Sequence, residues 1–399
     1  MFARRVRNLR PSGIREIFRL VAQMENPVNL SIGQAHFDVP DNVKEAACEA
    51  IQSGRNKYTV TGGLPELNDK IRASIMRRSG RCPEASLVTA GTSGALMLSY
   101  LSLLNPGDEI LLPDPYFIIY RSLAEILEVR PVYYDLYPDF RLTEAKLEAQ
   151  VSPRARVILI NTPANPTGAT LSESELRAVA RVAKRHDLLV IADEIYDAFV
   201  YDGRFRSIVE FCDKVLLLGG FSKTYGMPGW RLGYAVGPGA LIDIMATLQQ
   251  FSFVCASAPA QYAALVALET DMSPWIAEYR LKRQRIVEGL KGYYQAVTPG
   301  GSFYIFPRLP DGISGQDFVK RALDRKLLIV PGTAFSRRDS HFRISFAAED
   351  DDIDRGLAIL RDLAQPAEKR PNEECGDQES RDRESRGQER LGERAQIGG

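Results

Sequence analysis

The chain has few of the residues that hold metal ions or cross-link secreted proteins. It contains five cysteines and three histidines in 399 residues, and neither set shows the close spacing of a zinc site. An odd number of scattered cysteines fits reduced thiols in a cytosol better than a disulfide framework. The sequence therefore predicts a cytoplasmic protein that holds no metal.

The sequence also lacks an excess of charge of either sign and any long apolar segment. It has 51 basic and 51 acidic residues, so electrostatics offers no case for nucleic acid or an anionic membrane as the partner. No apolar run approaches the roughly 20 residues of a membrane span. The basic start, residues 1–7, has no apolar segment, so we expect a solvated or partner-crossing arm, not a secretory signal. An Arg-rich organellar presequence is the other interpretation.

What the chain does contain is an alternation of helical patterns and short apolar runs from about residue 45. Continuous apolar runs indicate strands covered on both faces, as in a mostly parallel sheet. Between two of them, residues 172–186 have a helical pattern that begins with Ser172 and Glu175 as a capping pair. We predict an α/β domain over residues 41–281, with ligands beyond the carboxyl ends of its strands. The runs are residues 110–112, 157–160, 188–191 and 215–218.

The pattern changes after residue 281. Residues 282–294 form a charged helical pattern, and residues 341–346 alternate, with Phe342, Ile344 and Phe346 on one face. This predicts a smaller α+β domain over residues 282–365, to which the N-terminal residues 1–40 contribute an arm. Residues 366–399 hold no aromatic residue and are predicted to be a disordered charged tail.

The most informative motif directly follows the apolar run at residues 215–218. Lys223 lies close to the predicted strand end, where burial lowers the pKa of an ammonium and leaves a nucleophilic amine. Eight residues later, Arg231 offers a charged fork that suits a phosphate. A lysine and an arginine so placed are what a Schiff base to pyridoxal phosphate (PLP) requires. The alternative is a surface loop with two unrelated cations.

Residues 222–234, Ser-Lys-Thr-Tyr-Gly-Met-Pro-Gly-Trp-Arg-Leu-Gly-Tyr, closely resemble the lysine signature of the class I/II aminotransferases, which are fold type I PLP enzymes. The resemblance extends over roughly residues 12–362. It implies a large PLP domain, whose mostly parallel sheet is sandwiched by helices, and a smaller α+β domain, as in aspartate aminotransferase. It also implies that Lys223 forms the Schiff base and that Arg231 binds the cofactor phosphate.

Two further motifs follow predicted strands in the order that the resemblance implies. In Asp-Glu-Ile-Tyr, Asp193 takes the place of the carboxylate against the pyridine nitrogen, and Tyr196 contacts the phenolic oxygen. Glu194 is then structural. In Asn-Pro-Thr-Gly, Asn165 donates to the same phenolic oxygen and lies beside the substrate. The simpler interpretations are a helix cap and a proline-rich turn.

The remaining cofactor residues come from a Gly-rich turn and an aromatic pair. Residues 89–96 open a helical pattern and resemble the family's phosphate cup, which implies that Thr92, Ser93 and Ser222 bind the phosphate. Gly220 stands where the family often has a hydroxyl residue. Phe117 is expected to stack on the pyridine ring, with Tyr116 as the second choice.

Three residues concern the substrate and a partner subunit. Gly33 is expected over the substrate carboxylate, and Arg343 is expected to bind that carboxylate with its fork, although a surface cation is the alternative. Tyr58 resembles the tyrosine that reaches the phosphate of the neighbouring subunit, which implies an obligate homodimer with shared active sites. A solvent-facing loop tyrosine is the alternative.

Together the motifs predict a PLP-dependent aminotransferase that moves an amino group between an L-amino acid and a 2-oxo acid. A PLP-dependent carbon–sulfur β-lyase on the same scaffold would show the same motifs. A non-catalytic PLP-binding regulator is the third interpretation, which the absence of a helix-turn-helix segment or a basic domain disfavours. The identity of donor and acceptor stays open.

Overall fold

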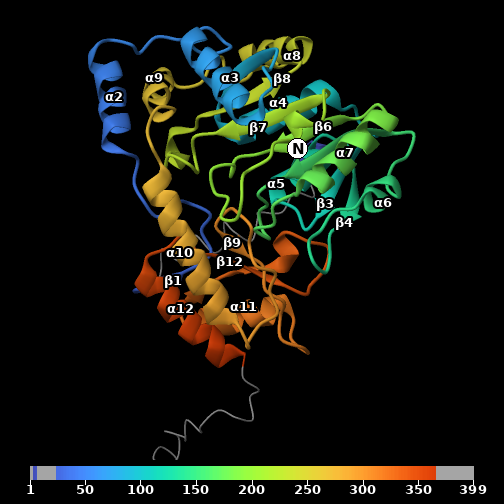
Figure 1. Cartoon of the computed structure of the whole chain (residues 1–399), viewed down its shortest axis with the longest axis vertical. Helices are drawn as coiled ribbons and strands as arrows, with labels where there is room; N and C mark the ends of the chain where they lie inside the picture. The colour runs from blue at the N-terminus through green and yellow to red at the C-terminus, as the bar shows by residue number, and fades with distance from the viewer. Residues whose placement is uncertain (1–2, 7–23, 365–399) are drawn as a thin grey trace, which may run out of the picture.

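A computed structural model describes residues 3–6 and 24–364 of the chain (Figure 1). The predictions for the first residues of the arm and for the tail at residues 366–399 lie largely outside this range. The described chain forms a large part around a central sheet and a smaller part beneath it in the figure, and the long helix α10 (Ser273–Leu290) runs between them. No helix in the described ranges is both long and apolar enough to cross a membrane.

The large part is organised by a seven-stranded sheet. β8 runs antiparallel to both of its neighbours, and the other strands pair in parallel. The four apolar runs of the sequence are the cores of β3, β5, β6 and β7, which confirms the predicted parallel sheet. In spatial order the strands are β2 (Ala85–Thr89), β8 (Gly233–Gly237), β7 (Val215–Gly220), β6 (Leu189–Asp193), β5 (Ala155–Asn161), β3 (Glu109–Asp114) and β4 (Arg130–Asp135).

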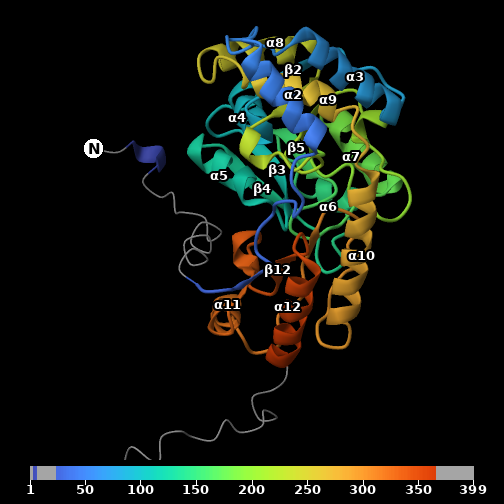
Figure 2. The same ribbon diagram turned by 90° about the vertical axis from the view of Figure 1, so that its left-hand side faces the viewer.

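Helices cover both faces of this sheet, which explains why its strands are continuously apolar. On β5, Ile158 and Ile160 pack into one core, whereas Val157 and Leu159 pack into the other. Figure 2 shows α4 and α5 on one side of the sheet and α7 on the other. The first core is closed by α2 (Asp41–Gln52), α3 (Pro65–Ser79), α7 (Glu173–Arg185) and α9 (Ala258–Ala267), and the second by α4 (Gly91–Leu103), α5 (Ile118–Ile126) and α8 (Gly239–Gln250).

Local signals explain several helix ends. Ser172 caps α7 and forms a capping box with Glu175, as the sequence predicts. The short helix α6 (Glu144–Glu148) is capped by Thr143. The charged helix predicted at residues 282–294 is wrongly bounded, because α10 begins nine residues earlier and ends at Leu290. Pro274 in its first turn is a start signal that the charged pattern concealed.

The small part contains short strands and two more helices. β9 (Tyr304–Ile305), β12 (Phe342–Ser345) and β11 (Val330–Pro331) form an antiparallel sheet, beside α11 (Gly315–Asp324) and α12 (Asp350–Leu363). β1 (Val28–Asn29) pairs with β10 (Leu327–Leu328), so a segment from before residue 41 joins this part. The predicted domain bounds remain a proposal, since residues 281 and 282 lie inside α10.

Candidate active site

A cavity of about 290 Å³ lies where β5, β6 and β7 end and the small sheet begins. This is the edge at which parallel sheets place ligands. Eleven of the twelve residues predicted for the site line it, from seven separate stretches of the sequence and both parts of the chain. They are Gly33, Thr92, Ser93, Phe117, Asn165, Asp193, Tyr196, Ser222, Lys223, Arg231 and Arg343.

Lys223 reaches the cavity from the loop that follows β7. Its Nζ donates a hydrogen bond of 2.6 Å to the carbonyl oxygen of Gly33. Burial, with a smaller contribution from the charge of Arg343, lowers the pKa of Lys223 to about 8, although Asp193 acts in the opposite direction. Near neutral pH, Lys223 therefore has a much larger fraction of neutral, nucleophilic amine than an ordinary lysine.

Asp193 is the last residue of β6 and is only 3% exposed. The Tyr120 hydroxyl donates to its Oδ2 at 2.7 Å, and the backbone N–H of Ile195 donates to its Oδ1 at 3.2 Å. Burial raises the pKa of Asp193, while these hydrogen bonds and Lys223 favour the carboxylate. A carboxylate fixed in this way at a cavity wall can hold a protonated ring nitrogen.

The N-terminus of α4 and Arg231 form an anion site at one end of the cavity. Thr92 and Ser93 lie in the first turn of α4, where the backbone N–H groups and the helix dipole favour a phosphate. Gly91 has φ +73°, and a Cβ there would lie 2.5 Å from Nη2 of Arg231. The guanidinium therefore lies directly against this turn. Ser93 and Arg231 are both exposed to solvent in the single chain.

Arg343 lies at the other end and is 2% exposed. Its Nη1 donates to Oδ1 of Asn165 at 2.9 Å, and its Nη2 donates to the carbonyl oxygen of Ser31 at 2.6 Å. The Tyr304 and Phe335 rings flank the guanidinium, each with its centroid 4.5 Å away. Within residues 24–364, no carboxylate forms an ion pair with Arg343. A buried cation with only neutral partners is a site for an anionic ligand.

This burial corrects the alternative of a surface cation. The predicted alternation of β12 holds, because Phe342 and Ile344 pack into the small core. Arg343 and Ser345, on the opposite face, are buried as well, since that face closes the cavity instead of meeting water.

Tyr304 and Gly33 lie in close contact beside Arg343. The hydroxyl groups of Tyr304 and Tyr196 are 3.0 Å apart. A Cβ on residue 33 would lie 2.0 Å from the Tyr304 hydroxyl oxygen, so only glycine fits below this ring. Tyr304 thus joins the predicted Tyr196, Gly33 and Arg343 in one packed wall.

The predicted aromatic residues differ in whether they line the cavity. Phe117 lines the cavity, whereas Tyr116 is 1% exposed, packs against Tyr133 and does not line it. Tyr58 is 83% exposed and does not reach the cavity of its own chain. Its predicted role toward a neighbouring subunit remains a prediction.

Sequence reasoning missed two tyrosines that line the cavity, Tyr120 and Tyr304. Tyr120 lies one helical turn after Phe117 on α5, and that spacing is the signal that could have found it. Tyr304 lies in the aromatic run at residues 303–306, where its hydroxyl was indistinguishable from those of core tyrosines.

Comparison with known proteins agrees with this geometry. The model of the family described as aminotransferase class I and II matches residues 25–360. A protein of Methanocaldococcus jannaschii named probable aspartate aminotransferase is 35% identical, with 91% of this chain and 100% of the relative covered. A single mutant of the Thermus thermophilus aspartate aminotransferase superposes with a TM-score of 0.86 at 31% identity, covering 91% of this chain and 99% of that chain.

An aromatic aminotransferase from Pyrococcus horikoshii OT3 gives a TM-score of 0.82 at 31% identity, over 87% of this chain and 98% of its own. The fold is thus the aspartate aminotransferase-like, fold type I architecture that the sequence predicts. The chain belongs to the class I and II aminotransferase family and is a transaminase.

Proposed function

We propose that the chain uses PLP, held covalently by Lys223, to exchange an amino group between an L-amino acid and a 2-oxo acid. The observation that carries this proposal is the set of four charged groups around one cavity. Lys223 is a lysine of lowered pKa, Asp193 is a buried carboxylate, Arg231 lies at a helix N-terminus and Arg343 is buried without an anion. A flat cofactor with an aldehyde, a ring nitrogen and a phosphate matches the first three.

The remaining residues fit the edges of such a cofactor. When bound, PLP supplies an electron sink that weakens the bonds to the Cα atom of the amino acid. Asp193 keeps the ring nitrogen protonated, and Asn165 and Tyr196 lie where they can donate to the phenolic oxygen. Thr92, Ser93, Ser222 and Phe117 line the same cavity; the three hydroxyl residues would complete the phosphate site with Arg231, and the Phe117 ring would stack on the cofactor.

Arg343 orients the amino acid. It binds the α-carboxylate through its fork, next to Asn165 and the backbone of Gly33. Once the amino group of the substrate has displaced it, the Lys223 amine, whose Nζ lies 2.6 Å from the Gly33 carbonyl oxygen, would be the general base for the proton on Cα. The reverse sequence with a second 2-oxo acid completes the transfer. The names of the relatives make aspartate and aromatic amino acids the first donors to test.

We also propose a homodimer with shared active sites. Exposed apolar side chains gather on two loops, 53–64 and 251–257. Gln249 of α8 and Gln261 of α9, the helices on either side of the second loop, donate hydrogen bonds to Thr61 and Thr59 of the first. This patch borders the phosphate end, because Phe253 packs near Gly94 in the first turns of α4. A second copy would cover it and bring its own tyrosine to the phosphate. The patch consists of Tyr58, Val60, Phe251, Phe253 and Val254.

Covalent trapping tests the proposal. We expect the purified protein to be yellow, and borohydride reduction followed by peptide mapping to label Lys223. Lys223→Ala should bind some PLP but lose turnover. A label on another lysine would overturn the assignment. Release of pyruvate and ammonia without any 2-oxo acid acceptor would instead identify a β-lyase.

A cytoplasmic location is proposed from the free thiols among the described cysteines.

A further inference from the structure

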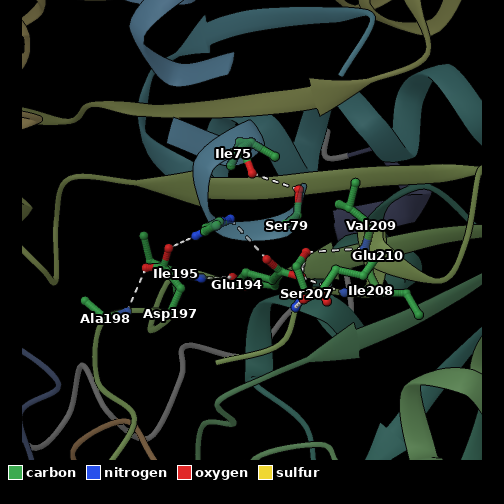
Figure 3. A network of polar contacts seen from close by, with 12 residues as sticks. Ile75, Ser79, Glu194, Ile195, Asp197, Ala198, Ser207, Ile208, Val209 and Glu210 are labelled. Atoms are coloured by element: carbon green, nitrogen blue, oxygen red, sulfur yellow. Dashed lines mark hydrogen bonds and ion pairs between the residues drawn. The ribbon is translucent and has the colours of Figure 1, made fainter. Parts of the chain in front are cut away.

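The chain at the end of β6 directs side chains to two sides. Asp193, Ile195 and Tyr196 line the cavity. Glu194 and Asp197, which directly follow Asp193 and Tyr196, do not line it and belong to a polar network in which Glu194 contacts the segment at residues 207–210 (Figure 3). Two residues proposed to contact the cofactor are thus each followed by an acid that faces the protein scaffold.

One arginine binds both of these acids. Arg78, in the last turn of α3, pairs through Nη2 with Oε2 of Glu194 at 3.1 Å and through Nη1 with Asp197. The Glu194 side chain is fully buried, and those of Arg78 and Asp197 are 20% and 26% exposed. An ion pair at this depth is less screened than a surface pair, and the planar fork sets its geometry.

The second oxygen of Glu194 is also bound. Its Oε1 accepts from Ser207 Oγ at 2.8 Å and from the backbone N–H of Ile208 at 3.3 Å. Burial raises the pKa of Glu194 to about 7, and Arg78 is the largest influence that favours its charged form. Without Arg78, this buried carboxylate would lose its cation and would tend to take up a proton or move.

The backbone of the segment also makes hydrogen bonds of its own, including those from Asn161 Nδ2 and the Thr162 N–H to the carbonyl oxygen of Asp193. The N–H of Glu194 donates to Leu218 at 3.0 Å, and the N–H of Asp197 donates to the carbonyl of Glu194 at 3.0 Å. The charge of Arg78 also acts on Tyr225, two residues beyond Lys223. Arg78 therefore lies behind both segments that carry the central residues of the proposed site.

We infer that Arg78 is a positioning residue, which holds Asp193 and Tyr196 against the cofactor by fixing Glu194 and Asp197 from behind. The inference rests on the proposed PLP function. Arg78 does not line the cavity. Its loss should loosen the cofactor ring while leaving the carboxylate site at Arg343 in place.

The test compares Arg78→Met and Arg78→Lys with the matched control Arg72→Met. Arg72 lies on the same helix, and among the described residues its one ion pair is with the exposed Asp69, one turn away. Each protein is stripped of PLP and reloaded. The readouts are the PLP dissociation constant, the visible circular dichroism of the bound cofactor, and the rate and saturation constants of the half-reaction with an amino acid. Melting temperatures are measured in parallel.

For Arg78→Met we expect PLP binding weaker by about tenfold or more and a half-reaction slower by a similar factor, because small misplacements of reacting groups have large effects. The saturation constant for the amino acid should change less than about threefold, since Arg343 is untouched. Arg78→Lys should recover little, because one ammonium cannot span two carboxylates. Arg72→Met should match the wild type.

The triple variant Arg78→Met/Glu194→Gln/Asp197→Asn distinguishes a positioning role from a folding defect, because it leaves no buried charge unpaired. We expect it to regain stability while its half-reaction stays slow and its cofactor signal altered. Wild-type rates in this variant, or in a folded Arg78→Met, would overturn the inference. Failure of the wild-type protein to bind PLP would instead overturn the proposed function.

Discussion

The two ends of the catalytic cavity are built differently. At one end Arg343 is 2% exposed and enclosed by Asn165, Ser31, Tyr304 and Phe335 of its own chain. At the other end, the Arg231 side chain is exposed next to an apolar patch that stays exposed among the residues the structure describes. A charge contact in the enclosed end is strong because water is excluded, whereas the open end needs a cover to reach similar strength. The enclosed end should therefore respond to substitutions within one chain, and the open end to subunit association.

The largest effect should come from the enclosed end. A hydrogen bond to a charged group contributes roughly 1.5–3 kcal/mol, and an unpaired buried carboxylate costs more. Arg343→Ala should therefore lose on the order of 10² or more in kcat/KM for amino acids, since about 1.4 kcal/mol corresponds to tenfold. Arg343→Lys should recover little, because a point charge does not replace the fork. Steady-state kinetics of the three proteins measures this.

Amines that lack a carboxylate provide the control. They should be poor substrates for the wild type and nearly indifferent to Arg343→Ala. If they react as well as amino acids, the enclosed end does not bind the carboxylate.

At the open end, substitutions should have an intermediate effect on activity, and this effect should depend on the neighbouring subunit. If Tyr58 serves the neighbouring subunit's phosphate, Tyr58→Phe should lower activity by about tenfold at limiting PLP, the size of one charge-assisted hydrogen bond. Mixed with inactive Lys223→Ala, it should gain activity, because hybrid dimers contain one site with both native residues. We expect about fivefold over the average of the separate proteins, given random exchange and that tenfold loss. Activity measured before and after exchange decides this, and a fully active monomer in sedimentation would contradict it.

A smaller effect concerns how the arginines at the two ends of the cavity change the pKa of Lys223. The neutral amine attacks the cofactor aldehyde, so the loading rate of the PLP-free protein should rise about tenfold per pH unit below the pKa. With the pKa of Lys223 at about 8, the rate should level off above that pH. Arg343 lowers this pKa more than Arg231 does, so Arg343→Met should move the midpoint to higher pH by more than Arg231→Met. Absorbance after mixing with PLP from pH 6 to 10 measures the midpoints, and equal shifts would remove this difference between the ends.

The smallest effect should follow from removing residues 366–399. They contain no aromatic residue, and Leu391 and Ile397 are their only large aliphatic residues, so they offer little apolar surface to either end of the cavity. Truncation after residue 365 should leave kcat/KM and the oligomeric state unchanged. A loss of activity or of the dimer would show that the tail contributes to one of the ends.

Much of the site could be predicted because its motifs are local. Lys223, Asp193 and Asn165 each follow a strand closely, and the strands are recognisable as continuous apolar runs. The parallel sheet then brings these strand ends to one edge. Arg343 was found in the same way, through the alternation of β12, although the burial of its polar face was not foreseen.

The rest depends on contacts between distant segments. Tyr120 meets Asp193 across 73 positions, and Arg78 meets Glu194 across 116. In the sequence, Arg78 stands beside Arg77 on a helix with several cations, and only packing distinguishes them. Tyr58 shows the same limit at the open end, because its proposed contact lies in another subunit.

The close approach of Gly33 to Tyr304 limits how this enzyme can be re-engineered. A single methyl group at position 33 would collide with the tyrosine hydroxyl, and the same ring covers the Arg343 guanidinium and meets Tyr196. Variation at position 33 would therefore disturb carboxylate binding and the cofactor contact together.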